Sequence, residues 1–176
     1  MPILQSGRRP WHSHQCRYWR SAASQPFFDA SVSFRGATFS DGTVTFNGAT
    51  FSGATVAFAS AKFSGGTVSF RSAAFAGARV SFRGATLSGA RVLFSNATFS
   101  AGMVECSGTK FADGEVTFRG ATFSGARDLF SNATFSGATV DLSTARGRPP
   151  SGLVPASEKP LPDGLILSPE WYPAKA

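Results

Sequence analysis

The sequence predicts an all-β solenoid, a fold in which one short unit is repeated along the chain. Three observations predict it. Large apolar positions recur at alternating steps of five and seven residues from residue 27 to residue 146, without insertion or deletion, and such a fixed period is typical of solenoids. Within each unit, apolar and polar residues alternate as they do in β-strands. All ten prolines lie outside this stretch, as continuous strand pairing requires.

The repeat also predicts the core. Of 20 recurring apolar positions, 17 hold Phe, two hold Leu and one holds Cys. A small residue, a Val and a Phe follow each other at every second position, so their side chains point to the same face of a strand. We expect that face to be the interior. The predicted core residues are Phe34, Phe39, Phe46, Phe51, Phe58, Phe63, Phe70, Phe75, Phe82, Phe94, Phe99, Phe111, Phe118, Phe123, Phe130 and Phe135.

Two coil lengths fit the twelve-residue period. A four-sided coil spans two periods, or about 24 residues, and gives the Phe side chains a rectangular core in which facing sheets pack about 10 Å apart. A two-sided coil spans one period, or about 12 residues, a loop so thin that it can barely enclose that spacing. The sequence therefore favours the four-sided coil and five coils in all, with the two-sided coil as the alternative.

The repeat resembles a known family. The segment A-T-F-S-G, unchanged at residues 49–53, 121–125 and 133–137, is similar to the pentapeptide repeat A-(D/N)-L-x-x, with every second unit extended to seven residues. The resemblance implies a right-handed, four-sided β-helix. Some members of that family protect type II topoisomerases by resembling duplex DNA, which requires a strongly acidic surface. Residues 27–146 carry ten basic and seven acidic side chains. The resemblance therefore implies the fold, whereas this basic charge disfavours mimicry of DNA.

Residues 1–26 form a basic leader, which we expect to be disordered. The leader contains four Arg and no acidic residue, and it lacks an apolar run long enough for a signal peptide or a membrane span. We therefore expect a cytoplasmic protein without membrane contact. The motif H-x-H-x-C at residues 12–16 offers three metal ligands without a fourth nearby, so no metal site is predicted.

Residues 147–176 form a proline-rich tail that cannot continue the solenoid. The apolar segments at 165–167 and 171–172 are unusual for a simple spacer. Because an open solenoid end exposes strand edges and apolar faces, we expect residues 151–176 to fold back over it. The alternative is a flexible tail that recruits a partner.

Two units of the repeat are irregular. Cys106 replaces a Phe and Thr109 replaces an Ala in one unit, and Asp128 replaces a Val in another. A buried Cys is usually a small apolar filler, and no base accompanies Cys106 in the sequence. An inward Asp128 requires an Arg partner, or else rotation out of the core. Both irregularities are interpreted as structural rather than catalytic.

No catalytic residue, metal ligand, cofactor or small-molecule substrate is predicted. No His lies in the repeat, and its glycines follow the coil period rather than a phosphate-binding motif. The sequence favours a non-enzymatic scaffold that presents a rigid surface to another protein. The alternative is nucleic-acid binding through the leader and outward arginines. The candidate surface residues are Arg35, Arg71, Arg83 and Arg119.

Overall fold

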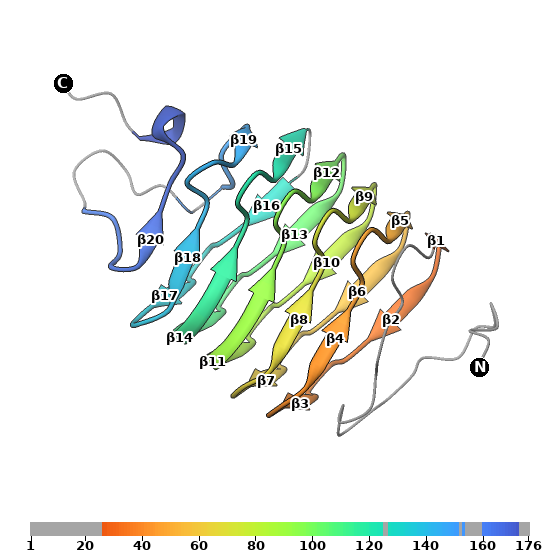
Figure 1. The fold of residues 1–176 in the computed structure, drawn as a ribbon, viewed down its shortest axis with the longest axis horizontal. Coiled ribbons are helices and arrows are strands. Elements are labelled where there is room, and N and C mark those ends of the chain that lie inside the picture. Colours follow the sequence, from red (N-terminus) through yellow and green to blue (C-terminus); the bar gives the residue numbers. More distant parts are fainter. Residues whose placement is uncertain (1–25, 125–126, 152, 154–159, 173–176) are drawn as a thin grey trace.

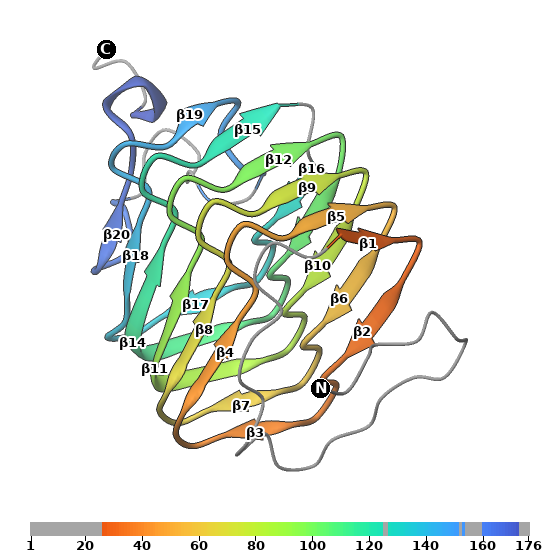
Figure 2. The same cartoon turned by 45° about the vertical axis from the view of Figure 1, so that its right-hand side comes forward.

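The chain forms a parallel β-solenoid of about 5 turns, with about 24 residues in each turn. The computed structural model describes residues 26–124, 127–151, 153 and 160–172. Every strand pair is parallel, and each residue lies beside its equivalent one coil later: Phe27 pairs with Phe51, and Val32 pairs with Val56. The coils are stacked as a prism (Figures 1 and 2). The predicted four-sided coil is therefore confirmed, and the alternative two-sided coil is wrong.

The first two sides of the prism are two separate sheets. The first side follows the order β1-β5-β9-β12-β15-β19 and the second the order β2-β6-β10-β13-β16. The first-side strands are β1 (Pro26–Phe28), β5 (Thr50–Ser52), β9 (Ala74–Ala76), β12 (Thr98–Ser100), β15 (Thr122–Ser124) and β19 (Arg146–Gly147). The second-side strands are β2 (Ser31–Ser33), β6 (Thr55–Ala57), β10 (Arg79–Ser81), β13 (Met103–Glu105) and β16 (Arg127–Leu129).

The third and fourth sides belong to one nine-stranded sheet, because two long strands run around the corner between them. These strands are β11 (Thr86–Leu93) and β14 (Lys110–Thr117). The third side also contains β3 (Thr38–Phe39), β7 (Lys62–Phe63) and β17 (Thr134–Phe135). The fourth side also contains β4 (Thr43–Thr45), β8 (Thr67–Ser69), β18 (Thr139–Asp141) and β20 (Leu165–Ile166).

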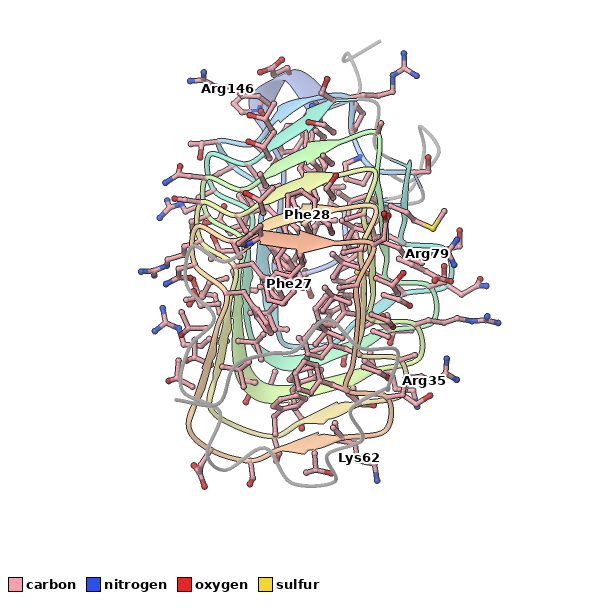
Figure 3. The ribbon with its side chains drawn as sticks, turned by 90° about the vertical axis from the view of Figure 1, so that its right-hand side faces the viewer. Phe27, Phe28, Arg35, Lys62, Arg79 and Arg146 are labelled. Atoms are coloured by element: carbon pink, nitrogen blue, oxygen red, sulfur yellow. The ribbon has the colours of Figure 1, made fainter. Side chains whose placement is uncertain are left out.

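The solenoid is right-handed. Seen from its amino-terminal end, the chain crosses the first side, descends the second, returns along the third and climbs the fourth as it recedes (Figure 3). Right-handed crossover is the usual hand for parallel strands in one sheet, because the twist of the strands favours it. The hand implied by the pentapeptide resemblance is therefore the observed one.

Phenylalanine rings fill the interior in columns. Rings one coil apart stack nearly parallel, with centroid distances from 4.7 Å for Phe39 and Phe63 to 5.1 Å for Phe34 and Phe58. Rings of neighbouring columns meet edge to face or tilted, an arrangement that the quadrupole of an aromatic ring favours. All the predicted core phenylalanines are buried except Phe135, which is partly buried because it lies in the last coil.

The corners depend on residues with positive φ. At one corner, successive coils place Gly36, Ser60, Gly84, Gly108 and Asn132 in the left-handed region, with φ between 57° and 67°. Glycine adopts this conformation without a Cβ penalty, and Asn tolerates it better than most residues. The Ser-Gly, Asn-Gly and Arg-Gly pairs of the sequence therefore mark where the chain turns.

The described part of the tail lies over the carboxyl-terminal end of the solenoid. Strand β20 pairs with β18, and Leu165, Leu167 and Trp171 are buried. The Trp171 indole Nε1–H donates a hydrogen bond to the carbonyl of Gly147 at 2.8 Å. Its ring meets Phe123 edge to face at 5.9 Å. A short 3-10 helix, η1 (Pro169–Trp171), carries this tryptophan.

Candidate interaction surface

Three arginines with described side chains point outward from the second side of the solenoid. Arg79 begins β10, while Arg35 and Arg83 lie at the turns that follow β2 and β10. Figure 3 shows Arg35 and Arg79 extending from this side into solvent. All three residues are exposed. We call this group the second-side arginines.

The backbone fixes the positions of the second-side arginines. The N–H of Arg79 donates to the carbonyl of Ala54 at 2.8 Å, and the carbonyl of Arg83 accepts from Ser60 N–H at 2.9 Å. Arg35 and Arg83 occupy the same place in coils that are two turns apart, so their backbones are separated by about 10 Å. Arg79 and Arg83 are four residues apart along one coil, which corresponds to about 13 Å of extended chain.

The second-side arginines form no ion pair with any residue that the structure describes. Glu105 is an acidic residue on this side, and Asp29 lies at the corner before β2. The Oε2 of Glu105 accepts a hydrogen bond from the Ser81 hydroxyl at 3.1 Å, rather than an ion pair from an arginine. The described part of the second side therefore carries three arginines that are not ion-paired, together with one carboxylate.

The fourth side differs in this respect. There, Arg91 Nε lies 3.0 Å from Glu115 Oε2, and Arg119 Nε lies 3.0 Å from Asp141 Oδ2. Only Arg71, among the three arginines of this side, has no ion pair with the described residues. The two sides thus carry three described arginine side chains each, of which two are ion-paired on the fourth side and none on the second.

The structure does not bring the four predicted surface arginines together. Arg35 and Arg83 lie beside the second side, with Ala59 between them in the intervening coil. Arg71 and Arg119 lie beside the fourth side, also two coils apart, and Arg119 is paired with Asp141. Arg79 occupies a second outward position of the repeat, at the start of a strand, as the alternation of the repeat predicts.

The irregular unit at residues 103–111 has a structural explanation. Cys106 is buried in the column that contains Phe58 and Phe82. Thr109, completely buried in an alanine position, donates its hydroxyl to the carbonyl of Phe82 at 2.8 Å. The larger Thr109 thus accompanies the smaller Cys106 in the same coil. The side chain of Asp128 and the H-x-H-x-C motif of residues 12–16 lie outside the described residues.

The described residues contain neither a cluster of metal ligands nor a membrane-spanning helix. They contain no group of three or more His, Cys, Asp or Glu side chains that could hold a metal ion. No helix in the described part is long and apolar enough to cross a membrane.

These observations define a repeat protein with a parallel β-solenoid fold. The sequence matches no family model, and no curated protein matches it. The solved structures similar to it include full-length QnrB1, a plasmid-mediated fluoroquinolone resistance protein (12% identity, covering 84% of this chain and 93% of that chain, TM-score 0.23). Another is HetL, a pentapeptide repeat protein involved in heterocyst differentiation regulation from the cyanobacterium Nostoc sp. strain PCC 7120. It is 15% identical, the match covers 91% of this chain and 94% of that chain, and the TM-score is 0.15. These TM-scores are too low for an inference from either structure. The fold of this chain is assigned from its own strand pairing.

Proposed function

We propose that the protein is a non-enzymatic scaffold whose second side binds an acidic segment of another protein. One observation carries this proposal: Arg35, Arg79 and Arg83 are exposed on a regular sheet and have no ion pair with the described residues. Arginine is suited to such a role because its planar guanidinium pairs with carboxylates through two parallel hydrogen bonds.

The rigidity of the scaffold supports this role. Each arginine is attached to backbone that is hydrogen-bonded to a neighbouring coil, so the spacing between the three Cα atoms changes little on binding. Because the sheet is already ordered, the entropic cost of binding falls mainly on the arginine side chains and on the partner. A partner with carboxylates about 10–13 Å apart would match this spacing.

Nucleic-acid binding is the alternative function. A coil of about 24 residues favours it less than the acidic partner, because the outward arginines are then widely spaced. Duplex DNA carries one negative charge for about every 1.7 Å of its axis, so a protein that follows it needs closely spaced cations. Here Ala59 separates Arg35 from Arg83 in the intervening coil. The second side therefore lacks a continuous arginine stripe in its described part.

Fluorescence anisotropy can test the proposal with two probes, a labelled poly-glutamate peptide and a labelled DNA duplex. The full chain is compared with the double variant Arg79→Ser/Arg83→Ser. The matched control, Arg71→Ser/Arg146→Ser, removes two exposed arginines from other sides and therefore changes the net charge equally. We expect the first variant to bind poly-glutamate about tenfold more weakly than the control does, a difference of about 1.4 kcal/mol.

Equal weakening of poly-glutamate binding in the two double variants would show that only net charge matters and would contradict the proposal. Tighter binding to the duplex than to the peptide, with a steep dependence on salt, would favour the nucleic-acid alternative. Loss of that duplex binding on removal of residues 1–26 would assign it to the leader.

A further inference from the structure

A large apolar side chain lies beside one of the second-side arginines. Met103 begins β13 and pairs in register with Arg79, which begins β10 in the preceding coil. Neighbouring strands of a sheet are about 4.8 Å apart, which is also the separation of these two backbones. Met103 is partly exposed, and its side chain points outward because that of the following residue, Val104, is buried in the core. The second side therefore offers an apolar contact next to Arg79.

An apolar residue is unusual at this position of the repeat. In the preceding coils the equivalent residues of the second side are polar: Ser31, Thr55 and Arg79. On the fourth side, which repeats the same strand half a coil later, the equivalent residues are also polar: Thr43, Thr67, Arg91, Glu115 and Thr139. Because polar residues fill this position elsewhere, the fold itself does not require a methionine here.

The same strand carries a negative charge beyond Met103. Glu105 lies two residues further along β13 on the same face, about 7 Å away. It pairs in register with Ser81, which lies between Arg79 and Arg83 in the sequence, and it accepts the Ser81 hydroxyl at 3.1 Å. A carboxylate of a partner over this coil would be repelled by Glu105. The position over Met103 therefore favours an uncharged residue of the partner.

From this arrangement we infer that the segment bound by the second side is acidic but carries a large apolar residue, which packs on Met103 next to the carboxylate that pairs with Arg79. This inference rests on the proposed function and names a residue that makes it specific. Arginine and methionine are both enriched at protein interfaces relative to the rest of the surface. Methionine adapts well to a partner because its unbranched thioether has several rotatable bonds.

The spacing of the two contacts fits an extended segment. Neighbouring residues of an extended chain are about 3.4 Å apart, and alternate residues are about 6.8 Å apart. The separation of Arg79 and Met103 lies between these two distances. An apolar residue one or two positions from a carboxylate can therefore reach Met103 while the carboxylate pairs with Arg79. A segment of carboxylates alone provides no apolar contact for the thioether.

Two peptide probes test this inference with the full-length chain. Both are labelled runs of glutamates interrupted by one central residue, which is leucine in the first peptide and serine in the second, so their charges are equal. Fluorescence anisotropy gives the dissociation constant of each peptide. We expect the leucine peptide to bind about fivefold more tightly, because only leucine can bury apolar surface on Met103. The ratio of the two constants should persist in added salt, which screens ion pairs but not an apolar contact.

Substitutions of Met103 assign the gain to this side chain. Met103→Ser should make the two peptides bind equally, with the affinity for the serine peptide unchanged, and Met103→Leu should retain the gain. The matched control is Ile166→Ser, which removes an apolar side chain that is 42% exposed on β20, on the fourth side. This control should leave the gain intact. Circular dichroism is used to verify that each variant is folded.

Failure of this inference is distinguishable from failure of the proposed function. Equal binding of both peptides by the unmodified chain, with both weakened by Arg79→Ser/Arg83→Ser, would overturn the inference and leave the acidic partner in place. A gain for leucine that survives Met103→Ser would also overturn the inference, because the leucine would then contact another surface. Binding of neither peptide would overturn both the inference and the proposed function.

Discussion

Phe39 and Phe63 stack with their ring centroids 4.7 Å apart and their planes within 5° of parallel. They are equivalent positions two repeat periods apart in the sequence, so this one contact fixes the length of a coil. A coil of a single period would instead have stacked Phe39 on Phe51 and placed Arg71 beside Arg83 in adjacent coils. The stacking of the core thus determines how positive charge is spread over the surface.

The central phenylalanine column should dominate stability. Phe70 is completely buried and stacks on Phe46 and Phe94, each at 5.0 Å. Phe70→Ala should lower the free energy of unfolding by about 3–5 kcal/mol, because it removes both stacks and leaves a cavity. Phe135→Ala should cost less, since Phe135 is only partly buried. Urea denaturation followed by circular dichroism measures both, and equal losses would contradict the stacked-core interpretation.

The sequence was sufficient to predict the fold because the same signal occurs in every coil. Strand alternation, corner glycines and phenylalanine spacing all indicate one interior, and the usual packing of about 10 Å between sheets selects the four-sided coil. Burial of Phe135 was overpredicted because the repeat treats every coil as internal. Where the coils end depends on contacts outside the repeat, which the period does not report.

The candidate surface was less predictable. The repeat specifies which side chains point outward, and so it located Arg35, Arg71, Arg83 and Arg119. The repeat does not specify which of these arginines are ion-paired, because a pair such as Arg119 with Asp141 joins residues of neighbouring coils. The unpaired state of the second-side arginines emerged only from the three-dimensional arrangement.

Glycine should be needed more at one corner than at another. Gly114 has φ of 97°, and a Cβ there would overlap the carbonyl oxygen of Ala90 in the coil below. Gly108 has φ of 65°, with no atom near the position of a Cβ. Gly108→Ala should cost about 1–2 kcal/mol, the usual cost of a left-handed alanine. Gly114→Ala should cost more in the same urea denaturation experiment, and a smaller loss would contradict this account of the corner.

Cys106 and Thr109 should be coupled. Thr109→Ala removes a buried methyl group and the hydrogen bond to Phe82, so we expect it to cost about 1–3 kcal/mol. Cys106→Phe alone should overpack the column by a similar amount. The double variant restores the usual residues of the repeat, and it should be more stable than the sum of the single changes predicts. A double-mutant cycle measures this coupling, and strict additivity would show that the two substitutions are independent.

The tail should protect the carboxyl-terminal end of the solenoid. Trp171→Ala removes the ring from Phe123 and the hydrogen bond to Gly147, and we expect it to lower stability by about 3–5 kcal/mol. Trp171→Phe retains a ring but loses the indole donor, so it should cost about 1 kcal/mol for the hydrogen bond, plus the contacts that only the larger indole ring makes.

Deleting residues 148–176 should expose the strand edges beneath and cause aggregation, measured by light scattering. A truncated chain with unchanged stability and no increase in scattering would show that the tail does not cap the solenoid.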